Sequence, residues 1–145
     1  MKPRCRLLLV DDNPADVGLA REALVESARH SEITSVEDGV EAMALLDRRG
    51  KYVTALRPDL IILDLSLPKK DGLAVLAAVK ARPELRSIPV VIFSTSQLSR
   101  DIVRSYELGA NCYVSKPGSL REFFSAVKSI EEFWCGFVNL PRQGE

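Results

Sequence analysis

The sequence predicts an α/β fold, a doubly wound parallel sheet of five strands with five helices. Short apolar runs rich in β-branched residues alternate with longer segments of helical periodicity, which favours a parallel sheet covered on both faces. The composition agrees, because 145 residues with 46% hydrophobic and 28% charged residues suit one globular domain. Chemically useful polar residues also follow four of the five strands, at the edge where ligands bind in such sheets.

Five apolar runs have the length and composition of strands. The run LIIL at residues 60–63 is the clearest, and VVIF at residues 90–93 follows Pro89. Neither run alternates with polar residues, which is typical of strands buried on both faces. The predicted strands cover residues 7–10, 33–36, 60–63, 90–93 and 112–114.

Each predicted strand is followed by a segment with helical signals. Asn13 is a good N-cap residue, and Pro14 suits the first helical position. Ser99 can cap the fourth helix, and Gly109 can end it. The polar stretch 48–58 is expected to loop out. The helices are predicted near residues 14–28, 40–46, 73–79, 99–108 and 119–134.

Charge and cysteine content exclude several classes of protein. The net charge is zero without a polybasic run, so nucleic acid is not an expected partner. The N-terminal apolar run is too short to span a membrane and lacks a cleavage site, so we expect a cytoplasmic protein without membrane contact. Cys5, Cys112 and Cys135 are odd in number and form no CxxC pair, which predicts reduced thiols. With His30 as the only histidine, a Cys/His metal site is not expected.

Five polar residues follow the carboxyl ends of predicted strands. Asp11 and Asp12 come after the first strand, Asp64 after the third, Ser94 after the fourth and Lys116 after the fifth. Because these ends meet at one edge of a parallel sheet, we expect the side chains to share one crevice. Each feature alone has an ordinary explanation as a helix cap, a turn or a solvated loop residue. Their joint occurrence favours a functional site.

Three carboxylates in one crevice predict a metal ion, because they repel one another unless a cation binds between them. Mg²⁺ suits such a site, since it prefers one or two carboxylates, water and a phosphate oxygen. We expect Asp12 and Asp64 as direct ligands and the backbone carbonyl of Ser66 as a third. Asp11 is expected to act through water.

The same crevice predicts phosphoryl transfer. Asp64 can act as a carboxylate nucleophile that accepts a phosphoryl group. Lys116 would pair with the Asp64 carboxylate or its acyl phosphate, and the Ser94 hydroxyl would donate to a phosphate oxygen. To promote phosphoryl transfer, a protein mainly has to position the reacting groups and neutralise their charge.

Four segments carry a resemblance to a known family: LLLVDDN (7–13), DLIILDLSLPKKDG (59–72), VVIFSTS (90–96) and GANCYVSKP (109–117). With them the chain resembles the receiver domain of two-component response regulators, over nearly its whole length. The resemblance implies a flavodoxin-like sheet of order 2-1-3-4-5, a receiver domain at residues 1–134 and a tail at residues 135–145. It also implies that a histidine kinase phosphorylates Asp64.

Further features follow from the same resemblance. Ser94 and Tyr113 stand where the family has its switch hydroxyl and rotating aromatic residue, and the bond between Lys116 and Pro117 would be cis. Thr95 departs from the small residue usual after the switch hydroxyl, so we expect slower hydrolysis and hindered small phosphodonors. The NPAD opening, the long loop and the ending EEFWCGFVNLPRQ resemble the small regulators partnered with phytochrome-type histidine kinases.

Rival functions fit the residues less well. A haloacid-dehalogenase-type phosphatase would use Asp64 but needs a second aspartate where Ser66 stands. A nucleotide- or flavin-binding module would show GxGxxG or GxxxxGKS/T, which the sequence lacks. A degenerate receiver that only binds partners would not need the intact acidic set. We expect a single-domain regulator in a phosphorelay, not an enzyme beyond Mg²⁺-dependent autophosphorylation from phosphohistidine and slow autodephosphorylation.

The end of the chain is rich in aromatic residues, with five of the nine lying from Phe123 onward. Four apolar side chains there have no obvious partner in their own domain: Phe124, Trp134, Phe137 and Leu140. An exposed apolar patch of this kind marks a partner surface, and we predict a homodimer through it. The alternative is that the tail folds back and caps its own domain.

Overall fold

The computed structural model describes residues 4–27 and 29–141. Within this part the sheet has five parallel strands: β1 (Arg6–Val10), β2 (Glu32–Val36), β3 (Leu60–Leu63), β4 (Val90–Ser94) and β5 (Cys112–Ser115). Their order is β2-β1-β3-β4-β5, which confirms the predicted doubly wound, flavodoxin-like topology.

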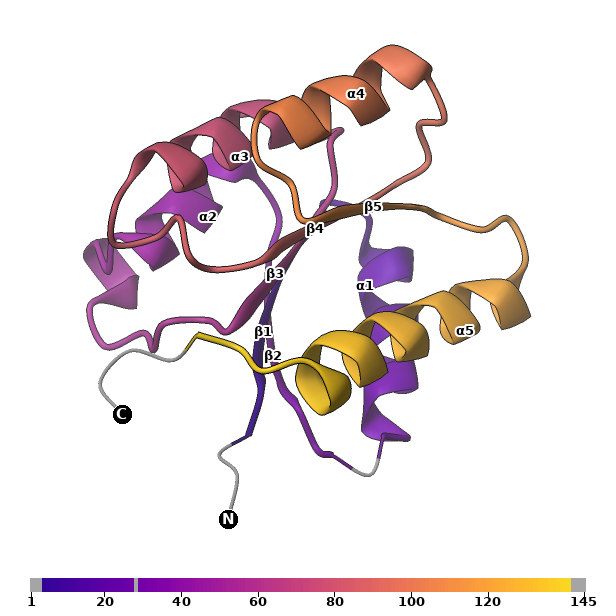
Figure 1. Cartoon of the computed structure of the whole chain (residues 1–145). Coiled ribbons are helices and arrows are strands. Elements are labelled where there is room, and N and C mark those ends of the chain that lie inside the picture. The colour runs from indigo at the N-terminus through magenta and orange to yellow at the C-terminus, as the bar shows by residue number, and fades with distance from the viewer. Residues whose placement is uncertain (1–3, 28, 142–145) are drawn as a thin grey trace.

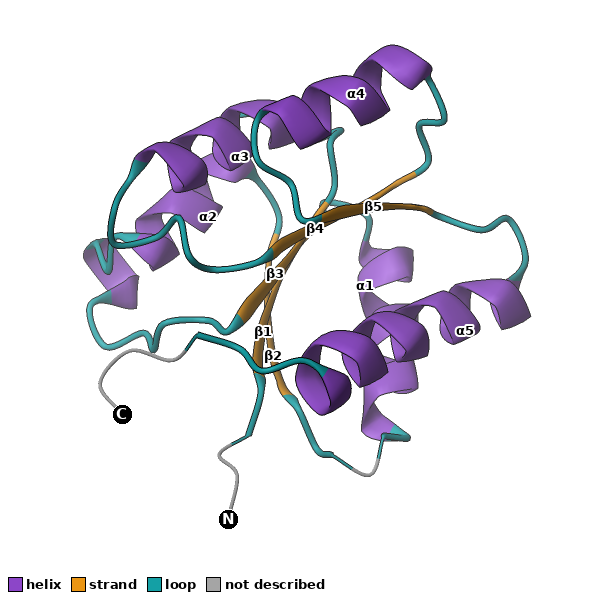
Figure 2. Ribbon diagram, in the orientation of Figure 1, coloured by secondary structure: helices purple, strands orange, loops and turns teal. Residues whose placement is uncertain are grey.

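Helices cover both faces of the sheet (Figure 1). α1 (Pro14–Val25) and α5 (Leu120–Glu131) pack together on one face, and α2 (Gly39–Leu46), α3 (Gly72–Ala81) and α4 (Ser99–Glu107) lie on the other. A loop separates each strand from the helix that follows it (Figure 2). This arrangement gathers the loops that leave the carboxyl ends of the strands at one edge.

The sheet divides the core into two layers. Along β1, Leu8 and Val10 pack on the side of α2 and α3, while Leu7 and Leu9 pack on the side of α1 and α5. All residues of β3 and β4 are buried, which explains the unbroken apolar runs in the sequence. Burying each large apolar side chain contributes roughly 1.5–3 kcal/mol, so these strands contribute strongly to the stability of the sheet that carries the site.

Side-chain caps set the starts of four helices. Asn13 accepts hydrogen bonds from the backbone amides of Ala15 and Asp16 at 3.0 and 3.2 Å, as predicted for α1. The predicted cap at Ser99 is wrong, because Ser99 is already helical and the capping position falls on Leu98 without a side-chain bond. The caps of α2, α3 and α5 are Asp38, Asp71 and Ser119.

Two predicted helix ends differ from the structure. α1 ends at Val25, and Ala28, its expected end, lies outside the described residues. α5 ends at Glu131 and continues as a π-helical turn, η2 (Glu132–Phe137), instead of a regular helix to Trp134. The 48–58 loop contains a short 3-10 turn, η1 (Gly50–Tyr52). No helix in the described ranges is long and apolar enough to cross a bilayer.

The peptide bond between Lys116 and Pro117 is trans, because the described residues contain no cis peptide bond. The expected cis bond is therefore wrong. The trans isomer of an X–Pro bond is favoured by about 0.5–1 kcal/mol. With the trans bond in place, the Lys116 side chain still reaches Asp64 at the strand ends.

Two of the three cysteines form a disulfide, so the expectation of reduced thiols is wrong for them. Cys5, buried just before β1, is bonded to Cys135 in η2, with the Cα atoms 5.8 Å apart. Cys112 is free. A count of cysteines could not reveal the pair, because folding brings together residues 130 positions apart.

Most of the apolar residues near the C-terminus pack on their own domain. Phe124, Trp134 and Leu140 are half-buried against the core layer beneath α1 and α5. The expectation that they lack an intramolecular contact is wrong. Phe124 reaches this layer from α5 itself, and the π-helical turn directs Trp134 and Leu140 onto it. Phe137 does stay 80% exposed. Residues 142–145 of the expected tail lie outside the described part of the chain.

Candidate functional site

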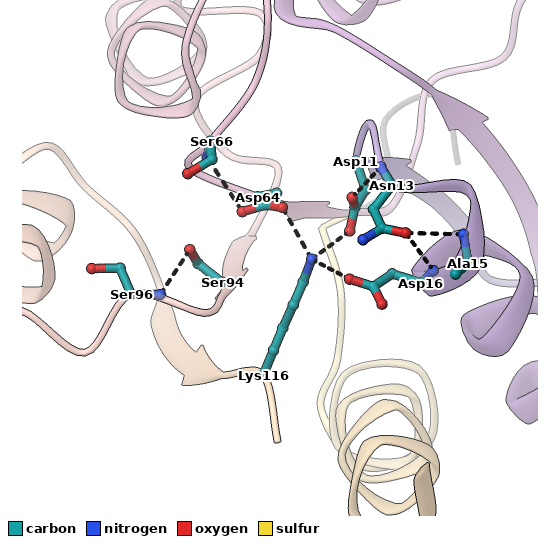
Figure 3. A network of polar contacts seen from close by, with 9 residues as sticks. All are labelled: Asp11, Asn13, Ala15, Asp16, Asp64, Ser66, Ser94, Ser96 and Lys116. Atoms are coloured by element: carbon teal, nitrogen blue, oxygen red, sulfur yellow. Dashed lines mark hydrogen bonds and ion pairs between the residues drawn. The ribbon is translucent and has the colours of Figure 1, made fainter. Parts of the chain in front are cut away.

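The carboxyl ends of four strands bring the predicted polar residues together (Figure 3). Asp11 follows β1, Asp64 follows β3, Ser94 ends β4 and Lys116 follows β5. All four are buried, although their side chains are polar or charged. Asp12 is the fifth predicted residue and is exposed beside them.

Lys116 is the centre of the charge network. Its Nζ atom lies 2.8 Å from Asp11 Oδ2, 3.0 Å from Asp64 Oδ2 and 2.9 Å from Asp16 Oδ2. Burial alone would lower the pKa of Lys116, but hydrogen bonds to Asp11 and Asp16 and the nearby negative charges raise it well above its usual value. The ammonium group therefore stays charged, as a fixed cation beside Asp64.

Asp16 is a site residue that the sequence did not single out. It lies in the first turn of α1, where the Asn13 cap holds its backbone amide. An acidic residue in a first helical turn is commonly explained by the helix dipole alone. Only the fold shows that this turn lies next to the loop after β5, so that Asp16 reaches Lys116. The available signal in the sequence was NPAD, which places Asp16 in the helical turn directly after the Asn13 cap and therefore near Asp11 and Asp12.

Each buried carboxylate uses both of its oxygens. Asp11 contacts Lys116 through Oδ2 and accepts a hydrogen bond from the Asn13 amide at 2.9 Å through Oδ1. Asp64 contacts Lys116 through Oδ2 and accepts one from the Ser66 amide at 3.3 Å through Oδ1. Burial raises the pKa of Asp11, and the charge of Asp64 adds to this, while Lys116 and the Asn13 amide act against it.

The acidic cluster fits a divalent cation. Asp11, Asp12 and Asp64 can each offer one carboxylate oxygen, and these oxygens lie within 4.8 Å of one another. Hard cations such as Mg²⁺ and Mn²⁺ bind oxygen donors of this kind, and the single charge of Lys116 cannot balance the carboxylates around it. The predicted third direct ligand, the backbone carbonyl of Ser66, stays a prediction, as does the contact of Asp11 through water.

Ser96 connects the two predicted switch residues, and the sequence did not single it out. Its amide donates to Ser94 Oγ at 3.3 Å, and its carbonyl accepts from the Tyr113 hydroxyl at 2.8 Å. Its own hydroxyl donates to Asp101 Oδ2 at 2.6 Å, which fixes the loop to α4. Tyr113 is half-buried and packs against the core layer beneath α2 and α3. Ser94 and Tyr113 are thus linked through one loop residue.

Gly72 explains how α3 approaches the loop after β3. A Cβ at this position would overlap the backbone of Asp64 and Leu65. Any larger residue would push the Asp71-capped start of α3 away from Asp64. The DG dipeptide thus serves the site and the helix cap together.

These features agree with a family model. The model for the response regulator receiver domain matches residues 7–128. This chain belongs to the response-regulator receiver family. The receiver is 47% identical over 135 residues to response regulator Rcp1 of Synechocystis sp., with 93% of this chain and 92% of Rcp1 covered.

Solved structures extend the likeness to the whole fold. The phosphorylated cyanobacterial phytochrome response regulator RcpA superposes on the receiver with a TM-score of 0.94 at 50% identity, covering 97% of this chain and 100% of RcpA. The Mn²⁺-bound form of Rcp1 gives a TM-score of 0.92 at 46% identity, again with 97% and 100% covered. The predicted resemblance to regulators of phytochrome systems is confirmed.

Family membership settles the class of function. Receivers of two-component systems are signalling switches, so the chain belongs with these regulators and not with phosphatases or nucleotide-binding modules. The acidic pocket, defined here as Asp11, Asp12, Asp16, Asp64 and Lys116, lies where the receiver fold gathers its strand ends.

Proposed function

We propose that Asp64 accepts a phosphoryl group from the phosphohistidine of a histidine kinase, and that the receiver then signals through protein contacts in a phosphorelay. The observation that carries this proposal is the buried Lys116 ammonium, 3.0 Å from the Asp64 carboxylate. A cation fixed beside one carboxylate offsets negative charge where the oxygens of a phosphoryl group would arrive.

The proposed step is a displacement at phosphorus. An Asp64 carboxylate oxygen forms a bond to phosphorus while the bond from phosphorus to the kinase imidazole nitrogen breaks. The electron pair of the broken bond stays on that nitrogen. Lys116 keeps its proton throughout, because the carboxylates around it raise its pKa. Its role is to hold charge, and slow autodephosphorylation would be the only turnover.

Mg²⁺ is the proposed cofactor, held directly by Asp12, Asp64 and the Ser66 carbonyl, with Asp11 acting through water. The support is the cluster of three carboxylate oxygens within 4.8 Å of one another. Exposed Asp12 leaves the cluster open to water, which suits an ion that keeps several water ligands. When bound, Mg²⁺ would neutralise charge on the phosphoryl oxygens during transfer.

The proposed switch runs through Ser94 and Tyr113. Phosphorylation adds strong acceptor oxygens beside Ser94, whose hydroxyl would turn towards them and give up its contact with the Ser96 amide. Because the Ser96 carbonyl also holds the Tyr113 hydroxyl, the loop and the aromatic ring would respond together. The outcome is a population shift between two packings of the surface formed by α4, β5 and α5.

The proposed donor is a phytochrome-type histidine kinase. RcpA, which shares 50% identity with the receiver, is described as a phytochrome response regulator. We expect the receiver in the cytoplasm, where such a kinase presents its phosphohistidine, and without nucleic acid as a partner. Thr95 is exposed directly after Ser94, where it would slow access of water and of small phosphodonors.

A homodimer is also proposed, through the exposed part of the C-terminal aromatic residues. Phe137 is 80% exposed and Phe133 is 49% exposed, with their ring centroids 5.9 Å apart. Of the four predicted interface residues, Phe137 offers the most free surface, and Phe124, Trp134 and Leu140 would contribute only their half-exposed edges. Two-fold pairing would bury this patch.

Phosphotransfer with matched variants tests the central proposal. A radiolabelled phytochrome-type histidine kinase is mixed with wild type, Asp64→Asn or Asp47→Asn, with Mg²⁺ or with EDTA. Asp47 lies at the end of α2, where it pairs with Arg49 and Arg82, and its variant serves as the control. We expect labelling of wild type and Asp47→Asn with Mg²⁺ only, and none of Asp64→Asn. Equal labelling of Asp64→Asn, or of wild type in EDTA, would overturn the proposal.

A further inference from the structure

The disulfide between Cys5 and Cys135 ties the two ends of the fold together. Cys5 is 5% exposed and lies just before β1, and Cys135 lies half-buried in η2. In Figure 1 the yellow C-terminal segment passes the end of β1 at which the chain enters the sheet. The bond therefore joins what we call the C-terminal segment, residues 132–141, to the first core strand.

Non-covalent contacts also hold the chain around this segment, beginning with Glu131, the last residue of α5. Glu131, which is 1% exposed, accepts hydrogen bonds from the hydroxyls of Ser27 at 2.8 Å and Ser31 at 2.7 Å. Arg29 forms an ion pair with the same carboxylate at 3.2 Å. The Arg29 guanidinium also lies against Gly136, so closely that a Cβ there would make it shift. The residues on both sides of Cys135 are thus held next to the connection between α1 and β2.

These contacts would keep Cys135 close to Cys5 when the covalent bond is open. The Cα atoms of Cys5 and Cys135 are 5.8 Å apart, which lies within the range that a disulfide needs. A pair positioned by its surroundings can form and break without refolding of the domain. Trp134 and Leu140 pack on the core layer beneath α1 and α5, so these contacts would keep the segment on the domain when the bond is open.

The third cysteine is not part of the pair. Cys112 lies in β5 and is half-buried next to the Trp134 indole. Burial raises the pKa of the Cys112 thiol, which keeps it protonated at neutral pH and weakens it as a nucleophile. It therefore provides an internal control in the same chain.

We propose that Cys5 and Cys135 are a redox modification site, a reversible pair whose disulfide locks the C-terminal segment onto β1. The oxidant is a small disulfide of the glutathione class. The Cys135 thiolate attacks one of its sulfurs, and a glutathione thiolate leaves. The Cys5 thiolate then attacks the Cys135 sulfur of the mixed disulfide, and a second glutathione thiolate leaves.

The electrons and protons balance in this exchange. The protein dithiol is oxidised by two electrons, glutathione disulfide is reduced to two glutathione molecules, and the two thiol protons pass to the departing thiolates. Cys135 reacts first because it is half-buried, whereas Cys5 is 5% exposed. Cytoplasmic thiol pools reverse accessible disulfides, so the state of the pair would follow the thiol–disulfide balance of the cell.

The bond acts on the C-terminal segment and not on the acidic pocket. Cys5 precedes β1 and Asp11 follows it, so the pair and the pocket lie at opposite edges of the sheet. Phe133 and Phe137 are the most exposed apolar residues of the segment. Oxidation thus fixes the position of the aromatic surface offered to partners, while the phosphoryl chemistry stays unchanged.

Thiol counting and hydrogen exchange test this proposal on the full chain. The protein is equilibrated in buffers with different ratios of glutathione to glutathione disulfide and is then quenched in acid. After denaturation its free thiols are alkylated, and mass spectrometry of the intact chain gives their number. We expect one alkylated thiol, Cys112, at the oxidised end and three at the reduced end. We also expect amide exchange in residues 132–141 to be at least tenfold faster in the reduced form.

Two variants separate the bond from its surroundings. Cys135→Ser should exchange in this segment like reduced wild type at every glutathione ratio, and Cys112→Ser should behave like wild type. Beryllofluoride binding, which reports the acidic pocket, should be the same in oxidised and reduced protein. Three free thiols or only glutathione adducts at the oxidised end would overturn the pair, and equal exchange in both redox forms would overturn the lock.

Discussion

Lys116 and Asp16 form an ion pair across 100 residues of sequence, with 2.9 Å between Nζ and Oδ2. The same ammonium group contacts Asp64, the proposed phosphoacceptor, at 3.0 Å. Asp16 lies in the first turn of α1 and its side chain is 22% exposed. The cation that would meet a phosphoryl group is therefore shared with a carboxylate that has no part in the transfer itself.

Neutralising Asp16 should strengthen binding of a phosphoryl mimic. In Asp16→Asn the amide no longer competes for the Lys116 charge, and one negative charge near the incoming anion is removed. We expect beryllofluoride with Mg²⁺ to bind about fivefold more tightly, or about 1 kcal/mol for a partly exposed ion pair. Calorimetric titration gives this affinity directly.

Asp47→Asn, which removes a carboxylate remote from the pocket, is the control for that titration. It should bind the mimic like wild type. Weaker binding by Asp16→Asn would show instead that Asp16 holds Lys116 in its productive position.

Removing the Ser94 hydroxyl should uncouple phosphorylation from its structural effect. Ser94→Ala keeps the Asp64 and Lys116 contacts, so we expect it to accept the phosphoryl group. The signals of Ser96 and Tyr113 in nuclear magnetic resonance spectra should shift on beryllofluoride binding in wild type and shift much less in the variant. Shifts of equal size in both proteins would contradict the proposed route through Ser96.

The acid stability of the fold should depend in part on Asp38. The Glu41 amide donates to its carboxylate at 2.8 Å and, with Lys69 nearby, holds the pKa of Asp38 below its usual value against the effect of burial. A lowered pKa gives stability above the pKa of the unfolded state, and this stability is lost as pH falls through the folded-state value. Asp38→Ala should lose about 1 kcal/mol of unfolding free energy at neutral pH.

Denaturant unfolding at neutral and acidic pH checks this prediction, with Asp38→Asn as the comparison. Asparagine keeps the cap but cannot titrate, so its unfolding free energy should fall less in acid than that of wild type. If the deficit of Asp38→Ala stayed constant down to strongly acidic pH, the assigned linkage would be incorrect.

Phe137 should control self-association. Phe137→Ser removes the most exposed aromatic ring of the C-terminal segment and should shift sedimentation at micromolar concentration from dimer to monomer. Val25→Ser is a matched control, because Val25 is 79% exposed at the far end of α1. A monomeric wild type, with or without phosphorylation, would rule out the dimer and leave the segment as a cap on its own domain.

The sequence predicted the features that follow from local pattern. The LIIL run marked β3, and the rule that sites lie beyond strand ends then placed Asp64 and Lys116 in one pocket. Ser99 failed as a predicted cap because helix starts shift easily by a residue, and here α4 begins at Ser99 itself. Local sequence pattern was therefore sufficient to predict the site residues that lie at strand ends.

Features that depend on distant segments were missed. Asp16 looks like an ordinary acidic residue in a first helical turn until α1 is placed beside the loop after β5. Cys135 pairs with Cys5 only because η2 turns back towards β1. The same turn gives Trp134 an intramolecular contact that helical periodicity could not predict.

The most direct test of the central claim is to identify which side chain carries the phosphoryl group. Borohydride reduction converts an aspartyl phosphate into homoserine, and peptide sequencing by mass spectrometry then locates it. After transfer from a phytochrome-type histidine kinase with Mg²⁺, we predict homoserine at position 64 alone. Homoserine at Asp11, Asp12 or Asp16, or phosphorylated receiver without any homoserine, would contradict the assignment of Asp64 as the phosphoacceptor.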